Sequence, residues 1–247
     1  MLVASTGTAN PDRWAESLEP LENSISSAFP TVETRRAFIS QPIIDKLYQR
    51  HGLKVPSVPQ ALDSLKADGF TRVLVQPTLI SKGFEHEQVA NAIASRSESL
   101  LMGLSLLSER ADYLAVSKIL IADCPFQPET GYVFVGHGSA NYEGPCVGLA
   151  QALSLFSSYI YVVAIKGNPT VDDAIRQASA CGMKKIVLRP FMITAGEHAA
   201  SDMGVKLKTR LAQAGFDVEC VFKGIGSIHG IQEIFVQHAA KALELCP

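Results

Sequence analysis

Residues Ala61–Glu85 read ALDSLKADGFTRVLVQPTLISKGFE, and residues Ala174–His198 repeat the pattern as AIRQASACGMKKIVLRPFMITAGEH. The two stretches share alanine, glycine, proline and isoleucine positions, and apolar residues stand opposite apolar residues along nearly the whole window. A repeat of this kind predicts a chain built from two similar halves. It also sets Glu85 opposite His198, so one backbone position carries a carboxylate in the first half and an imidazole in the second.

A second sequence similarity relates the first predicted strand of each half. LVASTGT at Leu2–Thr8 resembles VFVGHGS at Val133–Ser139, which sets Thr6 opposite His137. Open parallel sheets bind ligands in the crevice beyond the carboxyl ends of their strands. The sequence therefore predicts a cleft between the halves that is lined by Thr6, Glu85, His137 and His198.

Apolar runs of strand length alternate with stretches of helical period throughout the chain. Strands are predicted at Leu2–Ser5, Val32–Phe38, Arg72–Gln76, Leu104–Ser108, Tyr132–Val135, Tyr159–Ala164, Lys185–Arg189 and Asp217–Val221. Helices are predicted at Trp14–Ala28, Pro59–Asp68, Val171–Ala180 and Ile231–Leu245. This alternation is typical of α/β proteins, and we expect two pseudo-symmetric domains, each a four-stranded parallel sheet flanked by helices.

The segment Ala122–Gly131, ADCPFQPETG, carries two prolines and no apolar period, which is typical of a domain boundary. We therefore predict one domain at 1–124 and a second at 125–247 that carries both site histidines. The last helix is left free in this prediction to pack back on the first domain.

Composition excludes several classes of protein. The net charge of −2 and pI near 6.3 provide no basic face for nucleic acid. The apolar runs fall short of the roughly 18 residues that a membrane span needs. The N-terminus lacks the features of a secretory signal, and the five scattered cysteines form no CxxC pair, so we predict a cytoplasmic protein with reduced thiols.

Two histidines have settings that favour function. His137 ends an apolar strand between Gly136 and Gly138, where absent side chains let a ligand approach the backbone. A turn histidine that caps the following helix is the alternative. His198 begins a predicted helix, whose N-terminus favours a neutral imidazole. Its alternative is an exposed histidine of the first helical turn.

The other histidines are given no role. His51 precedes Gly52 and is predicted to lie in the last turn of a helix. His238 falls on the apolar face of the last helix and is predicted to be a core residue. His86 adjoins Glu85, and His229 precedes the last helix at a position that could line the rim of the cleft; neither is assigned a role.

Two imidazoles and a carboxylate suit a borderline divalent metal such as cobalt, iron, nickel or zinc. The chain has no HExxH motif, so such a site must be assembled from distant loops. It also has no phosphate-binding loop, and no GxGxxG after a first strand. We therefore expect no organic cofactor.

Several segments together resemble a known family. They are RRAFISQPIIDKL at Arg35–Leu47, VQP and GFEHEQV within Val75–Val89, VFVGHG at Val133–Gly138, RPFMITAGEHAASDM at Arg189–Met203 and FVQHAAKAL at Phe235–Leu243. On these motifs the chain resembles the class II chelatases, specifically the anaerobic sirohydrochlorin cobaltochelatases of cobalamin synthesis, over essentially its whole length.

The resemblance implies a chelatase-like fold that holds a tetrapyrrole between two similar domains. It implies insertion of a divalent metal, Co(II) before Fe(II) or Ni(II), into sirohydrochlorin without ATP, the metal being a substrate. His137 and His198 would then bind the metal and accept pyrrole protons, and Glu85 would assist. The expected tetrapyrrole-binding residues are Thr6, Gly136, Gly138, Lys82, Lys166 and Arg189.

Three positions depart from the family pattern. Lys166 stands where many members carry a glutamate that helps to bind cobalt, and Thr78 replaces a histidine. The acidic insert that usually follows Met203 is missing, because Gly204 leads directly into the helix. These departures keep two alternatives open, a non-catalytic tetrapyrrole- or metal-binding protein of this fold and an iron or nickel chelatase. A homo-oligomer is also left open.

Overall fold

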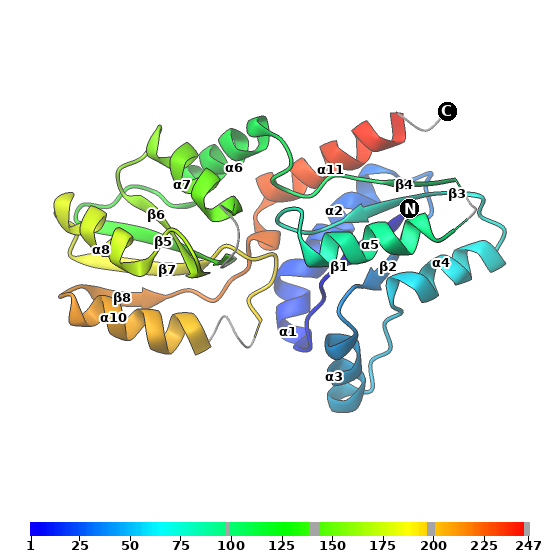
Figure 1. Cartoon of the computed structure of the whole chain (residues 1–247), viewed down its shortest axis with the longest axis horizontal. Coiled ribbons are helices and arrows are strands. Elements are labelled where there is room, and N and C mark those ends of the chain that lie inside the picture. The colour runs from blue at the N-terminus through cyan, green and yellow to red at the C-terminus, as the bar shows by residue number, and fades with distance from the viewer. Residues whose placement is uncertain (97–98, 139–143, 197–200, 245–247) are drawn as a thin grey trace. The chain divides into compact units, whose positions relative to one another are not determined.

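The computed structural model describes residues 1–96, 99–138, 144–196 and 201–244, which form two compact units (Figure 1). The first unit contains Met1–Ser108 and the C-terminal segment that begins at His229, and the second contains Glu109–Ile228. Within the described residues, no helix is both long and apolar enough to cross a membrane.

The first unit is built on a parallel sheet with strand order β2-β1-β3-β4. The strands are β1 (Leu2–Ser5), β2 (Arg35–Phe38), β3 (Arg72–Pro77) and β4 (Ser99–Met102). In the centre of the sheet, Ala4 of β1 pairs with Ala37 of β2 and with Pro77 of β3. The two central strands are almost wholly buried, as is typical of a sheet covered on both faces.

Helices cover both faces of this sheet (Figure 1). They are α1 (Pro11–Arg13), the π-helix η1 (Trp14–Leu18), α2 (Glu19–Ala28), α3 (Gln41–His51), α4 (Val58–Ala67), α5 (Phe84–Ala94) and α11 (His229–Glu244). A capping box formed by Ser57 and Gln60 starts α4. His51 ends α3, and Gly52 follows in the left-handed conformation with φ 68°, which confirms the predicted helix end.

The second unit repeats this topology with strand order β6-β5-β7-β8. Its strands are β5 (Thr130–Gly138), β6 (Ile160–Lys166), β7 (Lys185–Pro190) and β8 (Asp217–Cys220). Its helices are α6 (Arg110–Asp123), α7 (Pro145–Ser154), α8 (Val171–Ala180), the π-helix η2 (Asp202–Leu207), α10 (Lys208–Gln213) and the 3-10 helix η3 (Ile225–Ser227). The predicted fold class, two similar α/β domains with four-stranded parallel sheets, is confirmed.

The division of the chain differs from the predicted boundary between residues 124 and 125. The first unit ends at Ser108, and α6 belongs to the second unit, where it packs against α7. The proline-containing segment after α6 is held inside the second unit, since the Tyr132 hydroxyl donates a 3.0 Å hydrogen bond to the carbonyl of Pro125. A segment with the composition of a linker is therefore a packed connection.

The final helix of each sequence half belongs to the unit that contains the sheet of the other half. Helix α6 follows β4 and joins the second unit, while α11 follows β8 and packs on α2 and β3 of the first unit. His238 of α11 is buried, with 7% of its surface exposed, in agreement with its predicted place in the core. The two units thus exchange their last helices.

The fourth strand of the first half lies earlier than predicted. The prediction was Leu104–Ser108, whereas β4 is Ser99–Met102 and Gly103 follows it. A Cβ at Gly103 would collide with the side chain of buried Gln76. Leu106 is fully buried beyond this point, with its N–H bonded to the loop after β3. Apolar residues buried in a loop produced the same pattern as a strand.

Candidate functional site

The candidate site of the first unit lies where β1 ends and α5 begins. Thr6 directly follows β1, and Glu85 is the second residue of α5. The hydroxyl of Thr6 donates a hydrogen bond to the carboxylate of Glu85. The sequence predicted both residues on strand-end loops that line a cleft between the halves, and the structure brings these two into contact within the first unit.

Burial raises the pKa of the Glu85 carboxyl above its ordinary value, and the hydrogen bond from Thr6 opposes this rise only in part. A half-buried carboxylate with a raised pKa binds a proton more readily than an exposed one. Glu85 is therefore suited to take up a proton that a bound molecule releases.

Thr78 lies just beyond β3, at the same end of the sheet. Only 1% of its surface is exposed, and its hydroxyl oxygen lies 2.6 Å from the hydroxyl oxygen of Ser5. Its backbone N–H bonds the carbonyl of Ala4 at 2.8 Å. Thr78 thus joins the ends of β1 and β3, and its hydroxyl is already hydrogen-bonded.

Lys82 and His86 flank Glu85 in sequence. Lys82 is exposed and forms no ion pair with any residue that the structure describes. Burial, followed by the positive charge of Lys82, lowers the pKa of the His86 imidazole. The neutral form of His86 is therefore favoured, a property that sequence reasoning could not provide because it depends on burial at the start of α5.

The candidate site of the second unit lies at the end of β5. His137 is the penultimate residue of this strand, and its side chain is exposed. It stands between Gly136 and Gly138, two positions where close packing leaves no room for a side chain. A Cβ at Gly136 would lie 2.6 Å from the sulfur of Cys146. A Cβ at Gly138, whose φ is +64°, would collide with Ala164 and with the carbonyl of Lys166. Both glycines therefore let β5 approach its neighbours closely, and their expected role in ligand approach stays a prediction.

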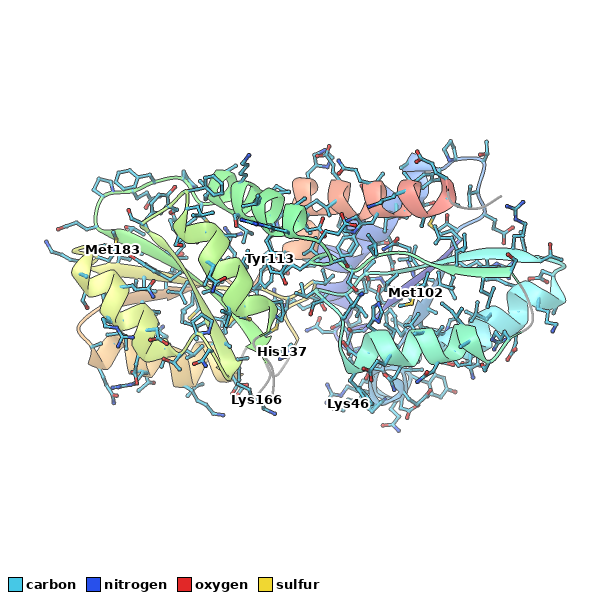
Figure 2. All side chains as sticks on the ribbon, turned by 45° about the horizontal axis from the view of Figure 1, so that its top comes forward. Lys46, Met102, Tyr113, His137, Lys166 and Met183 are labelled. Atoms are coloured by element: carbon cyan, nitrogen blue, oxygen red, sulfur yellow. The ribbon has the colours of Figure 1, made fainter. Side chains whose placement is uncertain are left out.

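Lys166 lies at the same end of the sheet as this histidine. It ends β6 and pairs in register with Gly138 of β5. Figure 2 shows His137 and Lys166 at the same end of the sheet. Lys166 is exposed and forms no ion pair within the described part of the chain, so its charge is available to a ligand.

Arg189 differs from the two lysines. Its guanidinium pairs with the carboxylate of Asp123, donates to the sulfur of Cys124 at 2.9 Å and lies 5.3 Å from the ring centre of Phe134. Only 13% of its side-chain surface is exposed. These contacts tie the end of α6 to β7 within the second unit. The predicted role of Arg189 in tetrapyrrole binding stays a prediction.

His198 lies outside the described residues. Among the residues that are described, no group of three or more histidine, cysteine, aspartate or glutamate side chains could hold a metal ion. The predicted cleft between the halves stays a prediction, because Glu85 and His137 belong to different units.

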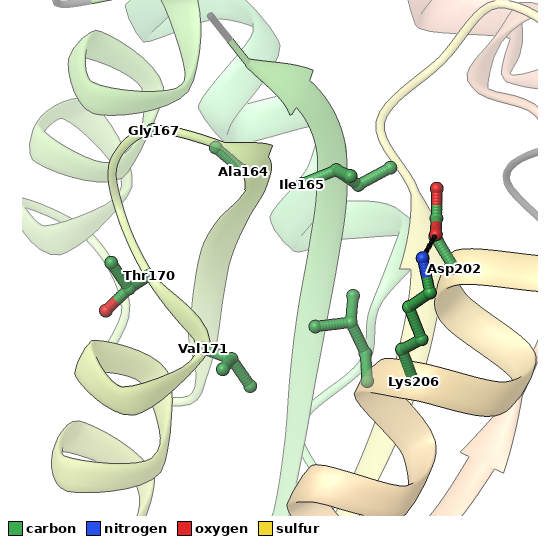
Figure 3. Close-up of a pocket in the computed structure, with 8 residues that line it drawn as sticks. Ala164, Ile165, Gly167, Thr170, Val171, Asp202 and Lys206 are labelled. Atoms are coloured by element: carbon green, nitrogen blue, oxygen red, sulfur yellow. Dashed lines mark hydrogen bonds and ion pairs between the residues drawn. The ribbon is translucent and has the colours of Figure 1, made fainter. Parts of the chain in front are cut away.

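A pocket of about 280 Å³ opens within the second unit, beyond the end of β6 (Figure 3). The pocket is lined by Ala164, Ile165, Gly167, Thr170, Val171, Asp202, Lys206 and Leu207. On its wall, the ammonium of Lys206 in η2 pairs with the carboxylate of Asp202 at 2.8 Å. Sequence reasoning missed this pocket, since its walls are separated by more than thirty residues; the turn at Gly167 is its only local signal.

Comparison with known proteins identifies the family. The family model described as cobalt chelatase (CbiK) matches residues 1–244. The chain belongs to this family. The resemblance inferred from the sequence motifs is thereby confirmed.

A curated relative supports the same assignment. The sirohydrochlorin cobaltochelatase of Salmonella typhimurium is 30% identical to the chain over 254 residues, which cover 99% of the chain and 96% of the relative. Likeness therefore extends over the whole of both proteins.

Solved structures share the fold at lower identity. SirB from Bacillus subtilis with Fe3+ has a TM-score of 0.67 and 14% identity, covering 98% of this chain and 94% of that one. The sirohydrochlorin chelatase SirB from Bacillus subtilis subspecies spizizenii in complex with cobalt has a TM-score of 0.61 and 13% identity, with coverage of 98% and 94%. At such identities the likeness establishes the fold alone.

Proposed function

We propose that this protein inserts Co(II) into sirohydrochlorin without ATP. The observation that carries the proposal is the likeness of the whole chain, at 30% identity, to a sirohydrochlorin cobaltochelatase, together with membership of the cobalt chelatase family. In the reaction, the metal ion bonds to the pyrrole nitrogens and two N–H protons leave the macrocycle. The protein must therefore hold a cation and accept two protons.

His137 and His198 are proposed as the metal ligands. A neutral imidazole holds a borderline divalent ion through one nitrogen and, once the ion has passed to the macrocycle, takes up a proton at the same nitrogen. The exposed place of His137 at the end of β5 supports this role, because a ligand can reach the ring. For His198, support comes from the sequence repeat and the family motif.

Glu85 is proposed to accept a pyrrole proton. Its raised pKa supports this, because the carboxylate is a stronger base than one in water. The substrate's acetate and propionate arms need cations, and Lys82 and Lys166 are proposed to bind them. Both are exposed and have no ion-pair partner among the residues described.

An anaerobic assay tests the proposal. Purified protein, sirohydrochlorin and cobalt are mixed, and insertion is followed by the metal-dependent change in tetrapyrrole absorption. We expect a rate above that of the uncatalysed reaction, and loss of that rate in both His137→Ala and His198→Ala. The matched control is His229→Ala, because His229 is exposed and pairs with Glu233 in α11. Equal rates with and without protein would refute a chelatase.

Lys166 favours a second candidate, a tetrapyrrole-binding protein that does not insert metal. A lysine at the same end of the sheet as His137 repels a divalent cation and attracts a carboxylate. Binding of one sirohydrochlorin per chain, with no turnover under any metal, would establish this function instead. The same assay with Co(II), Fe(II) and Ni(II) side by side decides among the metals, and we expect Co(II) to react fastest.

A further inference from the structure

Phe84 is exposed to an extent that its surroundings do not explain. It is the first residue of α5, and 75% of its surface is exposed. Of the four strongly exposed aromatic residues in the described chain, the other three have partners. Phe126 meets Tyr159 edge-on, and Tyr48 and Phe156 each have a lysine ammonium over the ring. Phe84 makes no ring contact with any described residue.

The position of Phe84 ties it to the candidate site. Glu85 follows it directly and is held by Thr6, so the backbone that carries the phenyl ring is fixed from one side. Gly83 precedes it in an extended conformation, and exposed Lys82 comes before that glycine. Within four residues the chain therefore presents a cation, an uncovered aromatic ring and a carboxyl group of raised pKa.

The sequence repeat also indicates that Phe84 occupies a surface position. In the alignment of the two halves, Phe84 stands opposite Glu197, whereas most apolar residues stand opposite apolar residues. A core position would require apolar residues in both copies. The phenyl ring is thus a feature of the first copy alone, and packing within its own unit does not account for it.

We propose that Phe84 is a substrate-contact residue whose ring lies against the face of the tetrapyrrole, while Lys82 binds one of its carboxylate arms. This inference rests on the proposed function. A flat conjugated ring system with carboxylates at its edge matches an exposed phenyl group beside a free ammonium, since an aromatic face favours offset stacking and a carboxylate favours a cation. Contact at Phe84 would bring the macrocycle next to Glu85, where a pyrrole proton can be accepted.

Three variants test the contact. Phe84→Ala removes the ring, Phe84→Trp keeps an aromatic face, and Phe126→Ala removes an exposed ring that lies in the other unit. The first measurement is the equilibrium binding of metal-free sirohydrochlorin under anaerobic conditions, followed by its absorption and fluorescence. The second is the KM and kcat of cobalt insertion, and thermal unfolding shows whether each variant is folded.

We expect Phe84→Ala to raise both Kd and KM about 10-fold, as for loss of a partly buried phenyl contact. Its kcat should change less than its KM, and its Tm should not fall, because the ring is exposed in the free protein. Phe84→Trp should bind as the wild type does. Phe126→Ala should match the wild type in Kd, KM and kcat, whereas loss of its edge-on contact with Tyr159 should lower its Tm.

Each contrary outcome has one meaning. Unchanged Kd and KM in Phe84→Ala, with an active wild type, overturn the contact and leave the proposed function intact. Equal losses in Phe84→Ala and Phe84→Trp overturn an aromatic contact, as does an equal loss in Phe126→Ala. A wild type that neither binds nor metallates sirohydrochlorin overturns both the contact and the function on which it rests.

Discussion

The hydroxyl of Thr6, at the end of β1, donates a hydrogen bond to the carboxylate of Glu85, in the first turn of α5. Residues 79 positions apart are thereby joined at one end of the sheet. Burial raises the pKa of Glu85 and the hydroxyl moderates that rise, so two local interactions set the basicity of the group that we propose as a proton acceptor.

Replacement of Glu85 by glutamine should reduce activity without loss of stability. The side chain keeps its size and still accepts a hydrogen bond from Thr6, but it no longer takes up a proton. We expect kcat to fall at least about 100-fold, the lower range for general-base catalysis. Anaerobic cobalt insertion measures this effect, and an unchanged kcat would remove Glu85 from the mechanism.

The same variant should change how stability depends on pH. Because the pKa of Glu85 is raised in the folded protein, its contribution to folding is complete below the unfolded-state pKa and is lost as the pH rises through the folded-state pKa. Glutamine has no such loss. The Tm of Glu85→Gln relative to the wild type should therefore be higher at about pH 8 than at about pH 4. A relative Tm that falls over this range would contradict the raised pKa.

Replacement of Thr6 by valine should raise the pKa of Glu85 further, since the hydrogen bond that stabilises the carboxylate is removed. The acidic limb of the kcat/KM profile should then move to higher pH. Thr8→Val is the matched control, because the hydroxyl of Thr8 accepts a hydrogen bond from the N–H of Asn10, whereas Thr6 is the residue whose hydroxyl bonds Glu85. A shift of the same size in both variants would show that the hydroxyl of Thr6 is not its cause.

Replacement of Gly136 by alanine should destabilise the second unit by about 1–3 kcal/mol, as overpacking does, because the new Cβ would meet the sulfur of Cys146. Removal of that sulfur in Cys146→Ala should rescue the variant. Urea unfolding of the single and double variants measures the coupling. Cys181→Ala, at an exposed cysteine, should provide no rescue. Additive effects of Gly136→Ala and Cys146→Ala would exclude the clash.

Replacement of Arg189 by lysine should lower stability but not substrate affinity. Lysine cannot keep the contacts with both Asp123 and Cys124, and hydrogen bonds of charged groups contribute about 1.5–3 kcal/mol. Lys166→Gln should show the reverse, a raised KM with an unchanged Tm, because its side chain is exposed. Thermal unfolding and steady-state kinetics of the two variants test this contrast. A raised KM with full stability in Arg189→Lys would support its predicted role in binding.

The repeated pattern was sufficient to predict the two halves and much of each sheet. Helix α8 has the predicted bounds, Val171–Ala180, because its capping threonine and apolar spacing are local signals. Strand β4 was misplaced, since burial of Leu106 in a loop produces the same apolar run as a strand. The structural division between the units falls after Ser108 and not within Ala122–Gly131. The composition of that segment could not show this, because it carries no information about the packing of α6 against α7.

The candidate site was predictable to the extent that it follows from strand ends. The contact of Thr6 with Glu85 and the common edge shared by His137 and Lys166 both follow from parallel topology. The ion pair of Arg189 could not be predicted, because its partner lies 66 residues earlier on a helix that the sequence assigned to the other domain.

The exchange of α6 and α11 bears on how such a chain could arise. A half-length ancestor ending in the equivalent helix would complete its core only as a dimer in which each copy lends that helix to the other, an arrangement of the domain-swapped kind. Fusion of two copies of the gene would then fix this helix exchange within one polypeptide. A half of the present chain, cut at the midpoint, would lack the helix that completes its core, and would fold only when the other half is supplied.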